Sequence, residues 1–565
     1  MLDILNQSLS LILSNPLGRI IYAIVTGLIL ALSLAGYGWG FLAWFSLIPL
    51  ILLIKSSDTI KGSLLDSFIF LFVYNLASFV WLLALHPLTW QGLTNTESIV
   101  VTLLAWITPS ISHSLILIPF IVICKLFFIY RADERSYELK ILDILFLTFL
   151  WTTIEFKLVL GLGDNLRSFF VPINFLAYSQ YKNLHFIQIA NLFGSIGIEY
   201  FIVFTNLILS NLFNVHKIHT NRRIIRSNLN VKKQFFGIER SRDYVEIGVL
   251  VSVLVIASYA YGFYNIDQYK KAYRVGKHQK IAILQADYSA QFTRSTQGFQ
   301  KLTQMQTNLS KSLSTQVDFL FWTEGAIPRS NYDSSALVSE LKSKARSFNY
   351  GTFITEGNNT YNGLRSFSHS EEVIVNNLGV NGTTTTIYND FPEDHYKKKV
   401  LVPYGEYTPF YKQLPGNLQS LANHSIGSGF TASKEIKNIK TAAGNYAPSI
   451  CFEILFPEHI RKFVNEDTNF LVNLNDLSWF KNTVSIFGIE LNFLKGFVHR
   501  MMLAAATFRA IENNRDLVLA SNSGISCIIK ATGSRERQTK INNIEMLEDR
   551  VLVINSPSIY TRFGW

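Results

Sequence analysis

The chain has 565 residues, of which 49% are hydrophobic and only 16% are charged, and its mean hydropathy is +0.22. Soluble globular proteins carry about 25% charged residues, so this composition favours a membrane protein and excludes disordered and collagen-like chains. The three cysteines are widely spaced, which excludes a small disulfide-stapled fold and a CxxC metal or redox motif. The net charge of +11 is compatible with nucleic-acid binding, but basic residues beside apolar segments favour cytoplasmic loops of a membrane protein.

The first 265 residues are predicted to form a membrane domain with about seven transmembrane helices. No charged residue occurs between Arg19 and Lys55, a stretch too long for one span of about 20 residues. Glycines within residues 36–40 divide this stretch into two short helices. The fifth span is interrupted by Glu155 and Lys157. The five spans after the first two cover residues 67–85, 99–127, 144–160, 186–213 and 247–264.

Lysine and arginine residues in alternate loops predict the orientation of these spans. They occur at positions 55 and 61, between 131 and 140, and repeatedly in the loop 214–246. Short loops rich in Lys and Arg stay in the cytoplasm, so everything after residue 265 is predicted to be extracytoplasmic. Contact with nucleic acid or anionic lipid is the alternative role for the loop 214–246. The regular alternation favours the topological role.

From about residue 280 the pattern changes to short apolar runs that alternate with helical ones. Such alternation indicates an α/β layered domain, which we assign to residues 266–565. Helices are expected at residues 335–348 and 497–514. Strands are expected at residues 280–285, 317–322, 352–355, 469–473, 517–520 and 550–554.

Three segments of this domain place a chemically active residue directly after an apolar strand, where α/β folds locate their sites. Each segment alone has a plainer explanation, because a solvated glutamate, surface lysines and a buried free cysteine are all common. Together they form a chemical unit: a carboxylate can take the proton of a thiol, and an ammonium can stabilise a thiolate and an oxyanion. The segments are residues 321–328, 396–407 and 449–457, and they contain Glu324, Lys398 and Cys451.

A glutamate, a lysine and a cysteine in this order resemble the catalytic set of the nitrilase superfamily. The sequences of the three segments most resemble its membrane-bound branch, the apolipoprotein N-acyltransferases. The resemblance extends over nearly the whole chain, and it implies an α-β-β-α sandwich for the α/β domain. Further matching segments lie at residues 42–50, 475–476, 479–480, 499, 508–513, 522–526 and 560–564.

This resemblance implies roles for individual residues. The implied general base is Glu324, the oxyanion-stabilising lysine is Lys398, and the nucleophile is Cys451. The register Y-x-K-x-x-L selects Lys398 over its two lysine neighbours. Supporting positions are Glu406, which helps hold the lysine and thiol, and Glu453, two residues after the nucleophile.

Three positions depart from the family pattern. Phe452 follows the nucleophile where tyrosine is common, so a hydroxyl hydrogen bond is lost there. An extra residue occurs at 477–478, and Phe292 is the nearest aromatic residue to a substrate-side tryptophan that this chain lacks. The intact set of Glu, Lys and Cys makes these departures modifiers of an active enzyme.

The implied activity is transfer of an acyl chain from a membrane glycerophospholipid, through a cysteine thioester, to the α-amino group of the diacylglyceryl-cysteine of apolipoproteins. The implied protein is a monomer in the bacterial inner membrane, with its catalytic domain on the periplasmic side, and needs no cofactor, metal or nucleic acid. A membrane-tethered nitrilase-type amidase, which passes the acyl group to water, is the alternative. A transporter or receptor would require the three catalytic residue types to coincide by chance.

Overall fold

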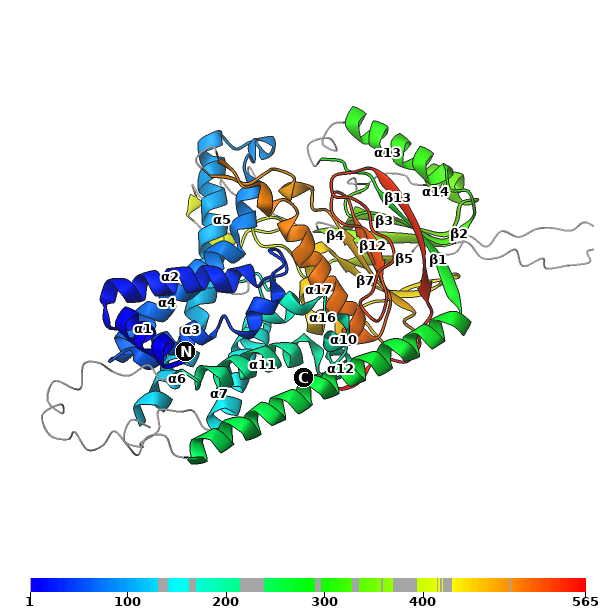
Figure 1. The fold of residues 1–565 in the computed structure, drawn as a ribbon. Coiled ribbons are helices and arrows are strands. Elements are labelled where there is room, and N and C mark those ends of the chain that lie inside the picture. The colour runs from blue at the N-terminus through cyan, green and yellow to red at the C-terminus, as the bar shows by residue number, and fades with distance from the viewer. Residues whose placement is uncertain are drawn as a thin grey trace, which may run out of the picture. The chain divides into compact units, whose positions relative to one another are not determined.

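The computed structural model describes residues 2–564, except 131–140, 162–168, 214–237, 290–295, 328–334, 357–358, 369–393, 414, 417–418, 420–428 and 487–488. The chain forms two compact units (Figure 1). The first unit comprises Met1–Leu83 and Val100–Tyr264, and the second comprises Ala84–Ile99 and Asn265–Trp565. The predicted division of the chain into domains 1–265 and 266–565 stays a prediction.

The first unit is built from helices. Helix α2 begins at Pro16, a position that suits proline because backbone N–H groups in the first turn have no partner within the helix. Asn15 caps the helix by accepting a hydrogen bond from Leu17 N. Short 3-10 turns lie at Gly40–Trp44, Val80–Leu85 and Leu176–Gln180. The helices are α1 (Leu2–Ser14), α2 (Pro16–Leu32), α3 (Ile48–Ser56), α4 (Ile60–Ser78), α5 (Asn95–Ile116), α6 (Ile118–Tyr130), α7 (Ile141–Thr153), α8 (Val159–Gly161), α10 (Leu184–Ile187), α11 (Ala190–Ser210) and α12 (Ile238–Val275). The first residues of α5 and the last residues of α12 belong to the second unit.

Several of these helices can cross a membrane. Four described helical stretches are long and apolar enough: Ile60–Ser78, Asn95–Tyr130, Ala190–Ser210 and Gly248–Val275. A fifth would be the pair Ile4–Ser14 and Pro16–Leu32, which is bent by 113°. The predicted number of about seven stays a prediction. The basic residues 131–140 and most of the loop 214–246 lie outside the described residues.

The second unit contains two mixed β-sheets. The first sheet has the strand order β13-β1-β2-β3-β4-β5 and the second has the order β12-β11-β8-β7-β6. Parallel pairing of β1 with β2, β2 with β3, β7 with β8 and β8 with β11 brings their carboxyl ends to one edge of each sheet. A two-stranded sheet pairs β9 (Ser485–Ile486) with β10 (Ile489–Glu490). The strands are β1 (His278–Gln285), β2 (Val317–Trp322), β3 (Ala345–Glu356), β4 (Asn359–Ser368), β5 (Asp394–Lys397), β6 (Ile439–Thr441), β7 (Gly444–Ile450), β8 (Phe470–Asn475), β11 (Leu517–Ser521), β12 (Cys527–Ile529) and β13 (Glu545–Leu552).

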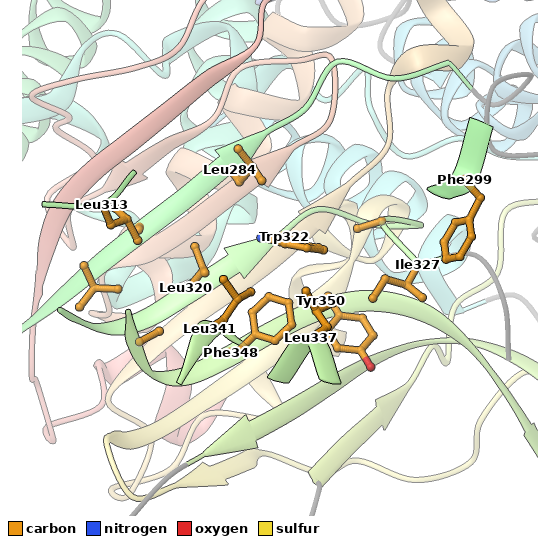
Figure 2. Packing of buried hydrophobic residues seen from close by; sticks show 14 residues of the cluster. Leu284, Phe299, Leu313, Leu320, Trp322, Ile327, Leu337, Leu341, Phe348 and Tyr350 are labelled. Carbon is orange, nitrogen blue, oxygen red and sulfur yellow. The ribbon is translucent and has the colours of Figure 1, made fainter. Parts of the chain in front are cut away.

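Aromatic side chains pack the two large sheets face to face. Phe319 of β2 lies 6.0 Å from Tyr446 of β7 and 5.1 Å from Phe470 of β8, measured between ring centroids. On the outer face of the first sheet, buried side chains from β1–β3 pack against α13 (Thr296–Lys311) and α14 (Ser335–Leu341), as Figure 2 shows around Trp322. Helix α17 (Phe497–Asn513) lies against β11 and β12 of the second sheet.

These layers run helix, sheet, sheet, helix. Together with the long apolar helices of the first unit, they confirm the predicted fold class of a helical membrane domain plus an α-β-β-α sandwich. The extracytoplasmic location of the sandwich stays a prediction.

One predicted helix was too long. The helix expected at residues 335–348 ends at Leu341, and β3 begins at Ala345. Ala345 and Phe348 are three residues apart, a spacing that also suits a helix. In the structure Phe348 and Tyr350 lie on one face of a strand, and the Phe348 ring packs 4.9 Å from that of Trp322. The strand expected at 352–355 is the end of this longer strand.

Candidate active site

Glu324 lies two residues after the end of β2 and is almost fully buried. Its Oε1 accepts a hydrogen bond from Asn362 Nδ2 at 2.8 Å, and its Oε2 accepts one from Asp476 N at 2.8 Å. The main chain here is crowded by Gly351 of β3, where an added Cβ would lie 2.6 Å from Glu324 Cα. Only glycine permits this close approach of the two strands.

A buried ammonium group faces this carboxylate. Lys398 directly follows β5, its side chain is fully buried, and its Nζ lies 2.9 Å from Glu406 Oε1 and 3.5 Å from Glu324 Oε1. The neighbouring lysines point elsewhere: Lys397 forms an ion pair with Glu356, and Lys399 Nζ donates to Lys434 O. The structure therefore directs only the middle lysine of the three into the cluster.

The nucleophile candidate Cys451 sits at a sharp strand-to-helix turn. Strand β7 ends at Ile450, and a 3-10 helix, Cys451–Leu455, begins immediately after it. The φ angle of Cys451 is +49°, a left-handed conformation that costs a non-glycine residue roughly 1–2 kcal/mol. Hydrogen bonds hold the turn: Ile450 N donates to Glu453 Oε2 at 2.8 Å, and Asn473 Nδ2 donates to Cys451 O at 3.4 Å.

The supporting residue Glu453 joins the cysteine turn to the lysine segment. Its fully buried carboxylate accepts hydrogen bonds from the backbone N–H groups of Lys399 and Val400, at 2.7 and 3.0 Å, and from the Tyr396 hydroxyl. Burial acts to raise its pKa, but His459 at 3.3 Å, the charge of Lys398 and the N–H of Val400 leave the pKa below its usual value. An ionised carboxylate therefore anchors both catalytic segments to each other.

The other supporting residues have distinct environments. Glu406 Oε2 accepts a hydrogen bond from Val402 N at 2.8 Å, which closes the loop that follows Lys398. Phe452 is buried, and its ring meets the edge of Phe456 at 5.2 Å. Cys527 is fully buried in β12 and Cys124 in α6, so of the three cysteine residues only Cys451 is partly exposed.

Asn362 is a residue that sequence analysis missed. It lies on β4, a strand that the sequence pattern did not predict, and its Nδ2 donates to both Glu324 Oε1 and Glu406 Oε1. Its main-chain oxygen also accepts a hydrogen bond from Lys398 N at 2.7 Å. No sequence signal marks an isolated asparagine as the link between two distant glutamates. Phe292, the nearest aromatic to the missing tryptophan, lies outside the described residues.

The electrostatics suit proton transfer from a thiol. Burial, together with the negative charges of Glu406 and Asp476, raises the pKa of Glu324 to about 7, although Lys398 acts to lower it. Burial and the charge of Glu324 raise the pKa of Cys451 well above its usual value, while Lys398 lowers it. Burial lowers the pKa of Lys398, but the carboxylates of Glu406 and Glu324 outweigh this and raise it. The cluster can thus hold a neutral thiol, a base that titrates near neutral pH and a permanent cation.

Comparisons with known proteins connect this site to a family. A model of the apolipoprotein N-acyltransferase N-terminal domain matches residues 26–208. The chain is 26% identical to an apolipoprotein N-acyltransferase of Geobacter metallireducens over 554 residues, which cover 96% of this chain and 91% of that protein. The chain is thus similar to apolipoprotein N-acyltransferases over nearly its whole length. The resemblance predicted from the motifs is thereby confirmed.

The similarity to apolipoprotein N-acyltransferases includes both units of the chain, because the Geobacter alignment spans nearly all of it. The apolipoprotein N-acyltransferase of Wigglesworthia glossinidia brevipalpis is 25% identical over 327 residues, which cover 56% of this chain and 57% of that protein. Relatives from Photobacterium profundum and Haemophilus influenzae carry the same name, at 26% and 29% identity over shorter stretches.

Solved structures from the nitrilase superfamily overlap with about half of the chain. A CN-hydrolase superfamily protein of Xanthomonas campestris has a TM-score of 0.32 at 11% identity, and covers 49% of this chain and 91% of its own. A Saccharomyces cerevisiae member of branch 10 of the nitrilase superfamily has a TM-score of 0.32 at 13% identity, and covers 49% of this chain and 90% of its own.

Proposed function

We propose that the chain is an apolipoprotein N-acyltransferase that moves an acyl chain from a membrane glycerophospholipid to the α-amino group of a diacylglyceryl-modified N-terminal cysteine. The observation that carries the proposal is the buried cluster in which Lys398 Nζ lies between two carboxylates beside the Cys451 turn. Similarity to apolipoprotein N-acyltransferases over 96% of the chain and several long apolar helices support a lipid substrate.

In the first step, Glu324 takes the proton from the Cys451 thiol, and the sulfur attacks the ester carbonyl of the phospholipid. A C–S bond forms, and the ester C–O bond breaks. Lys398 stabilises the oxyanion of the tetrahedral intermediate, because its ammonium is fixed in a water-poor site. The proton held by Glu324 passes to the departing oxygen, and a lysophospholipid leaves.

In the second step, the α-amino group of the acceptor attacks the thioester carbonyl. A C–N bond forms and the C–S bond breaks, so the acyl chain ends in an amide. Glu324 takes the proton that the amine loses, and the Cys451 thiolate recovers it. This ping-pong scheme returns the Glu, Lys and Cys set to its starting state without a net change in protonation.

The proposal includes a location and a state of assembly. Both lipid substrates would be reached at the outer surface of the inner membrane, so the second unit would lie on the periplasmic side and the enzyme would act as a monomer. Cysteines engineered into the loop 214–246 should resist an impermeant thiol reagent on whole cells, whereas a cysteine at exposed Lys437 should react. Labelling of the loop from outside would contradict this topology.

A single-turnover experiment separates the transferase from the amidase alternative. A thioester exposed to bulk water would hydrolyse, so a transferase must keep its acyl-enzyme dry until the amine arrives. Purified protein with phospholipid alone should stop after about one turnover, with a Cys451 thioester detected by mass spectrometry. A peptide with a diacylglyceryl-modified N-terminal cysteine should then discharge it to an amide, and the N-acetylated peptide should not. Steady release of free fatty acid without an acceptor would support the amidase.

A further inference from the structure

A segment from the N-terminal half of the sequence belongs to the second unit. Residues Ala84–Ile99 follow the helix Ile60–Ser78 and include the start of the helical stretch Asn95–Tyr130, both long and apolar enough to cross a membrane. Even so, the segment clusters with the α-β-β-α sandwich. The segment has its own internal hydrogen bonds. The buried Ser98 hydroxyl bonds with His86 Nδ1 at 2.8 Å and accepts a hydrogen bond from Leu88 N at 2.8 Å. Thr94 and Glu97 bond reciprocally, as in a capping box at the start of α5.

This segment contacts the loop that follows β8. The indole of Trp90 meets that of Trp479 edge to face, with ring centroids 4.8 Å apart and an interplanar angle of 72°. Asn482 Nδ2 donates to His86 O at 3.0 Å and is 3.4 Å from Ala84 O. Edge-to-face aromatic pairs have a preferred geometry, so these contacts restrict the position of the loop 476–482.

The same loop holds the proposed base. Asp476 N donates to Glu324 Oε2 at 2.8 Å, and Asp476 Oδ1 accepts hydrogen bonds from Ser478 N and Asn522 Nδ2, each at 3.0 Å. Toward its other end, Lys481 Nζ forms an ion pair with Asp287 Oδ1 at 2.7 Å. A shift of Trp479 would therefore be passed along three residues to the N–H group that orients the carboxylate.

We infer that Trp90 and Asn482 are positioning residues that hold the loop 476–482 so that Asp476 N donates to Glu324. This inference rests on the proposed function, in which Glu324 is the base, and it adds a role for a segment that lies outside the catalytic motifs. Neither residue touches the reacting atoms. Their effect on the reaction would pass through the orientation and the proton affinity of Glu324.

The direction of the effect follows from the groups around the base. Lys398 and Asn362 favour ionised Glu324, while the charges of Glu406 and Asp476 disfavour it, and Cys451 faces it as the proton donor. The N–H of Asp476 is a donor to the ionised form, and such a bond lowers the pKa of a carboxyl group. A small displacement of the loop breaks the hydrogen bond from Asp476 N to Glu324 Oε2. The Asp476 carboxylate stays nearby, because Asn522 Nδ2 holds its Oδ1, so its charge still disfavours ionised Glu324 and the pKa of Glu324 should rise.

The test measures single-turnover acylation of Cys451 by phospholipid vesicles as a function of pH. Trp90→Ala should slow acylation by about 10- to 100-fold, the size expected when a reacting group is misplaced by a fraction of an ångström to about 1 Å. The acidic limb of its pH profile, where the acylation rate rises as Glu324 ionises, should move to higher pH. Trp90→Phe keeps a ring at the contact and should recover most of the rate. Asn482→Ala should move the limb in the same direction.

Controls separate positioning from a general loss of structure. Thr89→Ala changes the exposed residue next to Trp90 in the same turn and should acylate like the parent protein. The double variant Trp90→Ala/Trp479→Ala should cost no more than Trp479→Ala alone, because both changes break one contact. Parental acylation and an unshifted limb in Trp90→Ala would overturn the inference, as would additive losses without a pH shift. A parent protein that forms no thioester would instead overturn the proposed function.

Discussion

Asn362 Nδ2 donates a hydrogen bond to Glu324 Oε1 at 2.8 Å, and the same nitrogen lies 2.7 Å from Glu406 Oε1. One amide thus connects two buried carboxylates that would otherwise repel each other, with Lys398 Nζ beside both. The arrangement fixes which oxygen of Glu324 faces the lysine.

Replacing Asn362 by alanine should impair the base without removing it. Loss of the donor to the ionised carboxylate should raise the pKa of Glu324 and slow acylation of Cys451 by roughly 10-fold or more, as a lost charge-assisted hydrogen bond contributes about 1.5–3 kcal/mol. Single-turnover kinetics between pH 5 and 9 would measure both effects. Asn359→Ala, on an exposed position of the same strand, is the matched control and should leave the rate unchanged.

The pH profile of acylation should report Glu324 directly. Its pKa is raised to about 7, chiefly by burial, and it must be ionised to accept the thiol proton. The acylation rate should therefore be low at pH 5, rise through about pH 7 and level off above it. Glu324→Gln should remove this limb and slow acylation at least ~10²-fold, as for loss of a general base. A limb centred near pH 4.5 would show that the carboxyl titrates as if it were exposed.

The three consecutive lysines should differ sharply when each is changed to methionine. Only Lys398 Nζ faces the carboxylates, so Lys398→Met should slow acylation ~10²-fold or more through loss of oxyanion stabilisation. Lys397→Met breaks a pair with Glu356 at a partly exposed site, and Lys399→Met removes a bond to Lys434 O. Both variants should keep most of the rate. A larger loss of acylation rate in Lys397→Met than in Lys398→Met would show that Lys398 is not the oxyanion-stabilising lysine.

Cys451→Ala should abolish thioester formation. Cys124→Ala and Cys527→Ala should still become acylated, because both thiols are fully buried and, in Cys527, burial raises the pKa to about 12. Intact-mass measurement after incubation with phospholipid would detect the added acyl mass in each variant. An acyl group mapped to Cys527 would rule out the proposed nucleophile.

Local patterns in the sequence predicted the broad architecture, and the resemblance to a known family predicted the three central residues of the proposed site. Apolar runs without charge predicted the helical first unit, and short apolar runs that alternate with helical stretches predicted β1, β2, β8 and β11. Glu324 and Cys451 follow the apolar ends of β2 and β7 by one or two residues, as short-range sequence predicted. Lys398 follows β5, whose polar sequence the apolar pattern did not mark as a strand. The hydrophobic pattern of a segment indicates its secondary structure because residues only a few positions apart determine that pattern.

Only the tertiary structure decided how these residues are connected. Asn362 lies 38 positions from Glu324 and 44 from Glu406, and Trp90 meets Trp479 across nearly 400 residues of sequence. Whether residues 345–348 form helix or strand likewise depended on packing against Trp322, not on the spacing of their apolar residues. Hydrogen bonds and ring contacts of this kind depend on which strands and loops meet in three dimensions. Local sequence patterns do not specify those long-range contacts.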